Sequence, residues 1–393
     1  MPAEWEPHAA TWLAWPHYRD DWPGKFEPIP WVYAEIIRNL AKHERVELIV
    51  RNAAAARQAR RVLERADAPS ANIRFHRWPT NRVWLRDSGC IFVTSGQSGF
   101  ANFPTSRATN AREMGHPVNS CPSLIPLKLR FNGWAKYSNW RHDEKIGSLI
   151  AKAAIPTSRA KGAREMGHPT IPTLFRKERE RRVGHPQVIH PLSDGKRVVL
   201  EGGSIDVNGA GTIITTEECL LSKVQERNPH MTRVHYEKVF ADYLGCSNTI
   251  WLGRGIAGDD THGHVDDLTR FVAKDTVVTM VEHNSKDENH APLLANLRRL
   301  EAARDQDGKQ LTIVEFPMPQ PVVFEGRRLP ASYANFYIAN GVVLVPVFNC
   351  TNDRIALNTL AQLFPTREII PIYSGDFIWG LGAMHCMTQQ QPA

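Results

Sequence analysis

The sequence of 393 residues predicts an α/β fold, because predicted helices and strands alternate along most of it with short connections. Apolar residues recur at helical spacing over residues 31–43, and the run Val46–Val50 that follows is typical of a buried strand. After residue 197 the predicted order is two strands, a helix and a strand, several times over. No unit repeats in sequence, so this repetition is one of topology.

The predicted elements follow the chain in this order. Before residue 104 we predict helices over 31–43 and 53–66 and strands over 46–50, 73–75 and 90–94, and a further helix over 143–154. The later predicted strands are 197–201, 211–215, 248–252, 268–272, 277–281, 311–316, 333–338, 342–347 and 369–372, and the later helices are 234–244, 291–303 and 354–364. Strands 197–201 and 211–215 are expected to pair around the turn Asn208-Gly209.

Two basic segments interrupt this alternation, over residues 104–128 and 155–196. Within them, residues 105–117 recur as residues 157–169 with two differences. A solenoid would need further copies with an apolar face to stack, and only two copies exist. We therefore interpret the chain as a single domain over residues 1–393, in which these two segments are inserted or poorly ordered.

Charge and composition argue against several classes of protein. The formal net charge of +7 arises between residues 104 and 197, which hold 18 Lys and Arg against 7 Asp and Glu. A surplus confined to one uneven segment, without a recognisable reader motif, is not typical of a nucleic-acid-binding surface. No apolar run is long enough to span a bilayer, and the acidic start is not that of a signal peptide. We expect a soluble protein of the cytoplasm without nucleic-acid or membrane partners, and homo-oligomerisation is compatible with the composition.

The six cysteines occur singly, without metal-binding spacing, so we expect reduced thiols and no structural metal site. Cys386 differs from the others because Gly380 and Gly382 precede it near the end of the chain. Glycine lets the backbone pass close to a ligand, so this stretch could open a slot over the sulfur. The alternative interpretation is that Cys386 is a small core residue in a terminal strand.

Three further motifs supply a base and several carboxylates. They are Trp84–Gly89 with Asp87, Glu201 before two glycines, and the pair His264 and Asp266. In an extended segment His264 and Asp266 would face the same side, because they alternate across Val265. The polar run just before them indicates a loop at a strand end, where functional sites commonly lie. Taken singly, each of these residues also has a structural explanation.

Together these residues suit a guanidinium ligand, which is planar, permanently charged and calls for carboxylates in its own plane. Asp87 and Asp266 would each bind one edge, and Cys386 would attack the central carbon. The bound cation would favour the thiolate of Cys386. His264 would protonate the departing ammonia and then activate water, with Glu201 orienting its ring. This chemistry requires no metal and no organic cofactor.

Several long motifs, in register over nearly the whole chain, resemble those of the agmatine deiminase family of the guanidine-modifying (pentein) superfamily. They are the stretches Met1–Pro7, Trp84–Gly89, Glu201–Ser204, Gly258–Asp267, Ala331–Tyr337 and His385–Pro392. The resemblance implies a five-bladed pseudo-symmetric α/β propeller of ββαβ units, and hydrolysis of agmatine to N-carbamoylputrescine and ammonia, a step toward putrescine. It also implies the roles given above for Asp87, Glu201, His264, Asp266 and Cys386, and Trp84 is expected to contribute to substrate binding.

The sequence departs from the family pattern at four positions. Cys90 stands where the family commonly has Pro, and Leu381 and Ala383 interrupt a glycine run before the nucleophile. His262 stands where Asp or Asn is usual, which bears on recognition of the substrate's amine end. We predict that His385 is structural, because a strand would point it away from Cys386.

Three alternatives stay open at the level of sequence. Free arginine or peptidyl arginine could replace agmatine as the substrate. A non-catalytic guanidine-binding protein would explain the interrupted glycine run. A cysteine protease or amidase also pairs Cys with His, but the papain-type cysteine signature is missing, and two carboxylates around a cation-shaped site have no role in peptide hydrolysis.

Overall fold

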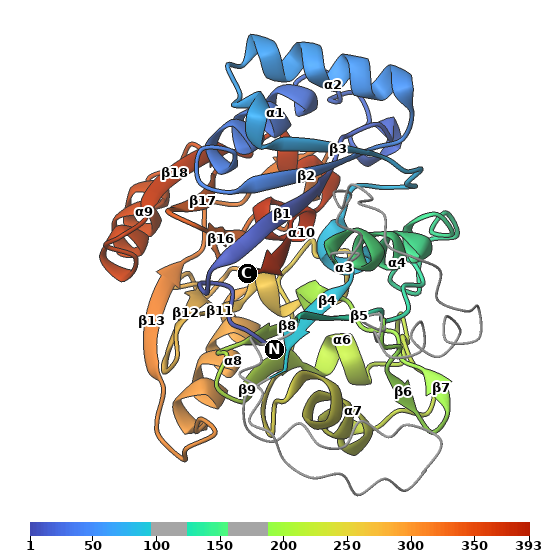
Figure 1. The fold of residues 1–393 in the computed structure, drawn as a ribbon. Helices are drawn as coiled ribbons and strands as arrows, with labels where there is room; N and C mark the ends of the chain where they lie inside the picture. Colours follow the sequence, from blue (N-terminus) through green and yellow to red (C-terminus); the bar gives the residue numbers. More distant parts are fainter. Residues whose placement is uncertain (96–123, 156–187) are drawn as a thin grey trace, which may run out of the picture.

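A computed structural model describes residues 1–95, 124–155 and 188–393, and Figure 1 shows how their elements are arranged. Helices and strands alternate along these residues, so the predicted α/β class is confirmed. The strands form several small sheets. Within the described part of the chain, no helix has the length and apolar character needed to cross a membrane.

Three of the sheets share one topology. In each, the first two strands are antiparallel, and a helical connection leads to a third strand parallel to the second. The first comprises β8 (Ile205–Val207), β9 (Thr212–Thr216), α6 (Glu217–Leu221), α7 (Arg233–Val239) and β10 (Asn248–Leu252). The second comprises β11 (Thr269–Ala273), β12 (Thr276–Val281), α8 (His290–Ala302) and β13 (Thr312–Pro317). The third comprises β16 (Tyr337–Ala339), β17 (Val342–Val347), α9 (Asn352–Leu363) and β18 (Glu368–Tyr373).

A fourth sheet joins the two ends of the chain. Its order is β19-β1-β2-β3, with β19 (Gln389–Pro392) antiparallel to β1 (His8–Ala14) and the other neighbours parallel. The strands β2 (Arg45–Val50) and β3 (Ile73–Arg77) follow the helices α1 (Ile29–Leu40) and α2 (Ala53–Arg65). The last residues of the chain thus supply the strand that pairs with β1 and lead directly from the segment that holds Cys386.

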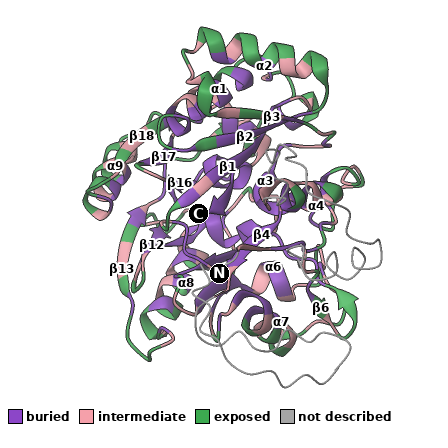
Figure 2. Cartoon of the chain, in the orientation of Figure 1, coloured by how far each residue is buried: buried purple, intermediate pink, exposed green. Residues whose placement is uncertain are grey.

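The remaining strands are short. They are β4 (Ile91–Thr94) with β5 (Leu124–Leu127), β6 (Leu192–Ser193) with β7 (Lys196–Arg197), and β14 (Val323–Phe324) with β15 (Arg327–Arg328). Helix α4 (Asp143–Ala154) has the bounds predicted from sequence. Figure 2 shows the buried residues gathered toward the inside of the molecule, while helices such as α2 and α9 keep an exposed outer face.

Two of the predicted strands are wrong in detail. Of the residues predicted as a strand over 197–201, only Arg197 lies in a named strand, β7. The antiparallel partner of β9 is β8 instead. The turn at Asn208 is confirmed, because its side-chain oxygen accepts hydrogen bonds from the N–H groups of Ala210 and Thr212. The predicted strand over 333–338 begins with a 3-10 turn, so its strand part is β16.

The predicted inserted segments lie partly outside the described residues. Of the segment 104–128, residues 124–128 belong to the fold, because β5 pairs with β4 and the Lys128 side chain is buried against Glu144. Of the segment 155–196, residues 155 and 188–196 are described, and the latter include β6. Residues 96–123 and 156–187 lie outside the description, and with them both copies of the repeat.

A buried ion-pair network ties the start of the chain to the sheets. Arg270 on β11 donates to Asp206 on β8, to Glu4 and to two backbone carbonyls. Glu4 also accepts from Arg86 at 3.1 Å and from the Ile338 N–H at 2.9 Å. Removing one partner of such a network leaves other buried charges unpaired, which costs more than the pair itself contributes.

We expect Arg270→Leu to destabilise the fold by about 3–5 kcal/mol, since it leaves the Asp206 carboxylate buried without its cation and removes one of the cations that pair with Glu4. The shift of the urea midpoint, followed by circular dichroism, measures this. Lys238→Met is the control, because it breaks an exposed pair with Asp242 and should leave the midpoint unchanged. Equal shifts for the two variants would contradict the role given to Arg270.

Candidate active site

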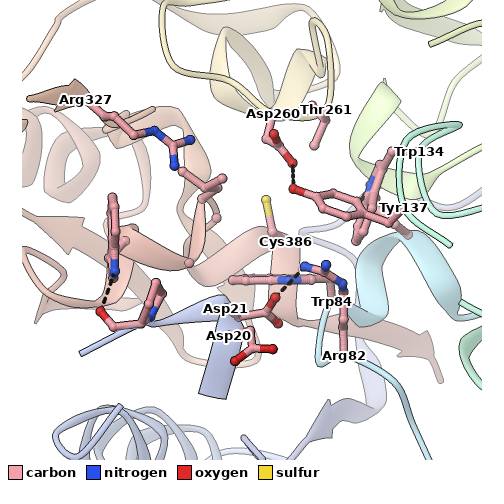
Figure 3. Close-up of a pocket in the computed structure, with 16 residues that line it drawn as sticks. Asp20, Asp21, Arg82, Trp84, Trp134, Tyr137, Asp260, Thr261, Arg327 and Cys386 are labelled. Carbon is pink, nitrogen blue, oxygen red and sulfur yellow. Dashed lines mark hydrogen bonds and ion pairs between the residues drawn. The ribbon is translucent and has the colours of Figure 1, made fainter. Parts of the chain in front are cut away.

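A cavity opens over Cys386, and Figure 3 shows its lining. The sulfur points into the cavity, between Trp84 on one side and the hydrogen-bonded pair Tyr137 and Asp260 on the other. The residues that line the cavity are Asp20, Asp21, Pro23, Arg82, Trp84, Asp87, Trp134, Tyr137, Asp260, Thr261, Arg327, Trp379, Gly380, Leu381, Gly382 and Cys386. Three of the six residues predicted for the site, Trp84, Asp87 and Cys386, therefore line one cavity.

Cys386 lies in a short helix, α10 (Met384–Met387), so the alternative that placed it in a terminal strand is wrong. The side chain of Asn335 holds this turn, because its oxygen accepts from the N–H groups of His385 and Cys386. The amide nitrogen of Asn335 lies 3.0 Å from the Cys386 sulfur. Asn335 stands in one of the motifs that carry the family resemblance, but no pattern within the sequence singled it out.

The residues just before Cys386 have different surroundings. A Cβ on Gly382 would lie 2.8 Å from the Trp84 ring and 3.1 Å from the Cβ of Cys386, so only glycine fits between them. Leu381 has φ +67°, a left-handed conformation that L residues rarely adopt, and it lines the cavity. Leu381, where the family commonly has glycine, therefore adds an apolar side chain to the cavity that Cys386 lines, and the cavity stays open.

Asp87, His264 and Asp266 converge beside Cys386. The Nδ1 atom of His264 lies 3.9 Å from a carboxylate oxygen of Asp87 and 3.9 Å from one of Asp266. Asp266 Oδ2 lies 3.5 Å from the Cys386 sulfur. The predicted extended segment through His264 and Asp266 is wrong, because Val265–Asp267 forms a 3-10 turn, yet both side chains still reach the site.

Gly203 packs directly against the side chains of His264, Asp266 and Asp87. A Cβ at Gly203 would lie 2.5 Å from His264 Nδ1, 3.0 Å from Asp266 and 3.1 Å from Asp87. The Gly203 N–H donates to Asp87 Oδ1 at 3.0 Å, and the Trp134 indole N–H donates to Asp87 Oδ2 at 2.8 Å. Both oxygens of Asp87 are thereby fixed in position. Trp134 was not found by the sequence analysis, and a lone Trp in a loop gives no signal for such a role.

Glu201 lies on the far side of the His264 ring, as predicted for its partner. Its Oε2 is 3.9 Å from His264 Nε2, and Arg227 Nε lies 3.2 Å from its Oε1. Burial alone would raise the pKa of Glu201, but Arg227 and His264 outweigh burial and lower this pKa to about 2. Glu201 is therefore ionised whenever the protein is folded. Arg227 is a further residue that sequence reasoning missed, because nothing near it in sequence marks a buried arginine.

The other groups respond to burial and to each other's charge. Burial raises the pKa of Asp87 to about 6. Burial alone would lower the pKa of His264, but Asp87, Cys219 and Glu201 outweigh it and raise this pKa well above its usual value. Burial and the carboxylates of Asp266, Asp267 and Asp87 raise the pKa of Cys386 well above the usual range. Without a bound cation Cys386 is therefore a thiol, and a cation between the carboxylates reverses the largest charge effects.

The side chains with unsatisfied polar atoms indicate where a ligand binds. Both ring nitrogens of His264 and Oδ1 of Asp266 are buried without a hydrogen-bond partner among the described residues. Buried polar groups are almost always paired, and three unpaired atoms on two neighbouring residues are compatible with a bound ligand that supplies the partners. A planar cation with N–H donors on its edges would satisfy the Asp266 oxygen.

One group of described residues has donor atoms of the kinds that bind a metal. Its members are Glu201, Cys219 and His264, whose ligand atoms lie within 4.8 Å of one another. Arg227 already neutralises Glu201, and a divalent cation at that place would face this guanidinium at short range. We therefore interpret these three residues as the surroundings of His264.

His385, the residue before Cys386, also contacts the site. It lies on α10, so the strand assumed in predicting a purely structural role is wrong. Its Nδ1 lies 2.7 Å from Asp266 Oδ2 and its Nε2 lies 2.8 Å from Glu4 Oε2. Burial alone would raise the pKa of Asp266, but His385 outweighs it and lowers this pKa. His385 is thus a positioning residue that keeps Asp266 ionised.

The family model described as Porphyromonas-type peptidyl-arginine deiminase matches residues 1–392. The chain belongs to this family. It is 31% identical to a protein named agmatine deiminase from Pseudomonas syringae pv. tomato and 30% identical to one from Pseudomonas aeruginosa, and each match covers 100% of this chain and 95% of the relative.

Solved structures agree with this membership. The structure of a C. jejuni agmatine deiminase variant with substrate bound superposes with a TM-score of 0.75 at 25% identity, covering 100% of this chain and 96% of the other. The agmatine deiminase of Enterococcus faecalis superposes with a TM-score of 0.77 at 26% identity, covering 100% and 95%. The chain therefore shares the fold of these two agmatine deiminases along its whole length.

The pKa of Cys386 leads to a prediction about its reactivity. At neutral pH we expect a cationic haloacetamidine to alkylate Cys386 at least roughly tenfold faster than neutral iodoacetamide, because only the cation stabilises the thiolate. Mass spectrometry of tryptic peptides over time gives both rates. Cys350, a half-buried thiol outside the cavity lining, serves as the internal control and should show no such preference. If the two reagents alkylated Cys386 at equal rates, as expected for Cys350, the result would contradict the proposed arrangement.

The contact between His385 and Asp266 leads to a second prediction. Asn at position 385 keeps a donor near Nδ1, toward Asp266, whereas Gln keeps a donor near Nε2, toward Glu4. In a Cys386→Ala background we expect His385→Gln to weaken binding of methylguanidine about tenfold and His385→Asn to weaken it less. The deficit of His385→Gln should shrink as pH rises, because loss of the histidine raises the pKa of Asp266.

Isothermal titration over a pH series measures both variants, and thermal melts confirm that they are folded. A merely structural role of His385 would give equal losses in the two variants at every pH.

Proposed function

We propose that this protein hydrolyses agmatine to N-carbamoylputrescine and ammonia through a covalent intermediate on Cys386. The observation that carries the proposal is that one imidazole and a second buried carboxylate lie directly beside the thiol and the carboxylate that line a single cavity. The relatives named agmatine deiminase support it, since they match the chain from end to end. A thiol beside two buried carboxylates suits attack on a cationic guanidine better than attack on a neutral peptide bond.

Binding depends on the two carboxylates. Asp87 and Asp266 each lie within 3.9 Å of His264 Nδ1, and each would accept N–H donors from one edge of the guanidinium. Trp84, which lines the cavity at the sulfur, would cover the face of the bound group. The cavity wall of Trp379 and Leu381 offers apolar contact for the aliphatic chain of the substrate.

The chemical steps follow from the protonation states. Binding of the cation lowers the pKa of Cys386, whose thiol releases its proton to solvent, and the thiolate forms a C–S bond at the central carbon. The protonated His264 gives its proton to the departing nitrogen, so the C–N bond breaks and ammonia leaves. The neutral imidazole then removes a proton from water, whose oxygen attacks the thiouronium carbon. The C–S bond breaks and the remaining hydroxyl proton passes to solvent, where ammonia takes it up, so the neutral ureido product forms and the thiolate and imidazolium are restored. Glu201, held ionised by Arg227, stabilises the imidazolium.

We also infer that the chain is a single catalytic domain with five ββαβ units. The three sheets of β8–β10, β11–β13 and β16–β18 support this, because they share strand order and direction. The pairing of β19, β1 and β2 gives a fourth unit of the same kind. The antiparallel pair β4 and β5, followed by α4, supplies the start of a fifth. One hydrophobic cluster extends from Trp12 to Met387, which supports a single domain.

A second candidate function is deimination of a guanidine that also carries a carboxylate, such as free or peptidyl arginine. Arg327 lines the cavity, and a cation at this position would attract such a carboxylate. Asp20 also lines the cavity and would favour the amine end of agmatine instead. His262, which the sequence analysis linked to the amine end, contacts Ser222 and does not appear among the lining residues.

Turnover assays test the proposal. We expect ureido product and an equal amount of ammonia from agmatine, with much lower kcat/KM for arginine and for a blocked arginine peptide. Cys386→Ala should lower kcat by roughly 10³-fold or more, whereas Cys350→Ala should keep wild-type activity. Undiminished turnover by Cys386→Ala would refute the mechanism, and a preference for either carboxylate-bearing substrate would support the second candidate.

A further inference from the structure

A second cavity has a strongly basic lining. It measures about 240 Å³, and its charged lining residues are Arg130, Asp194, Lys196, Arg197 and Arg227, with His230 beside them. These cations come from three separate segments: the chain after β5, strand β7, and the loop before α7. Four basic side chains against one acid around one hollow is unusual, because surface charges of opposite sign are normally interspersed.

Apart from Arg227, which pairs with Glu201, the cations of this basic cavity are only weakly neutralised. Arg197 is 3.6 Å from Glu144 and donates to the Lys128 carbonyl. Arg130 and Lys196 are exposed, and no ion pair to an acid is found for either of them among the described residues. The one acid of the lining, Asp194, lies 3.4 Å from His235. An anion that entered the basic cavity would therefore meet free donors.

Arg227 connects the basic cavity to the catalytic site. Its side chain is fully buried, and its Nε donates to Glu201, whose other oxygen faces His264. Its terminal nitrogens donate to the carbonyls of Gln225 and Thr261. Thr261 lines the catalytic cavity. A charge placed in the basic cavity thus acts on Arg227, the guanidinium that contributes most to keeping Glu201 ionised.

We propose that the basic cavity binds a small oxyanion of the phosphate type, and that its occupancy alters catalysis through Arg227 and Glu201. Two guanidinium forks and an ammonium match the several oxygens of a tetrahedral oxyanion, and arginine binds such groups in bidentate fashion. A bound anion shares the charge of Arg227 and weakens its pull on Glu201. Binding is independent of the proposed deiminase activity, whereas its effect on turnover rests on that activity.

Binding is tested on the full-length protein with the Cys386→Ala substitution, so that turnover plays no part. Thermal melts with inorganic phosphate, at ionic strength held constant with sodium chloride, should show a saturable rise in Tm. Arg130→Gln combined with Lys196→Gln should need about tenfold more phosphate for the same rise. The control, Arg57→Gln with Lys309→Gln, makes the same change of net charge at exposed positions outside the basic cavity. It should respond like the parent protein.

Equal responses of the two double variants, or no saturable rise in the parent, would overturn the site. Parallel melts with pyrophosphate and AMP show whether a free oxyanion or a phosphorylated metabolite binds at the lower concentration. In the active enzyme, phosphate should shift the pH profile of kcat, and the Arg130→Gln and Lys196→Gln variant should lose this shift. A shift of equal size in that variant would show that phosphate acts elsewhere.

Discussion

The burial of several carboxylates around one imidazole and one thiol is the constraint on which the rest of this structure depends. Asp87, Asp266 and Glu201 are removed from water, and only Glu201 has a buried guanidinium as a direct partner. Removing like charges from solvent is unfavourable, so the free protein compensates by protonating His264 and keeping Cys386 as a thiol. The site is therefore complementary to a cationic ligand.

This arrangement makes the reactivity of Cys386, the proposed nucleophile, depend on a bound cation. Burial and the three neighbouring acids oppose a thiolate, so reactivity toward neutral compounds is suppressed until a guanidinium offsets the negative charge. The same cation pairs with the free oxygen of Asp266. Charge compensation thus links recognition to activation, and selectivity does not depend on shape alone.

The supporting contacts come from distant parts of the chain. Glu4 near the start of the chain and Asn335 in its last fifth both fix the turn that carries Cys386, one through His385 and the other directly. The pairing of β19 with β1 brings the two ends of the chain together beside the site. A buried network of this kind holds each carboxylate close to a fixed partner, which limits rearrangement when the ligand arrives.

The sequence by itself determined the elements with strong local periodicity. Helix α4 and strand β10 have the predicted bounds, because apolar spacing reports burial directly. It also indicated Cys386, His264 and Glu201 as chemical candidates through residue type and flanking glycines. The tertiary structure alone decided the rest: the helical turn at Cys386, and the roles of Trp134, Arg227, Asn335 and His385. Those roles depend on contacts between residues far apart in sequence, for which local propensity carries no information.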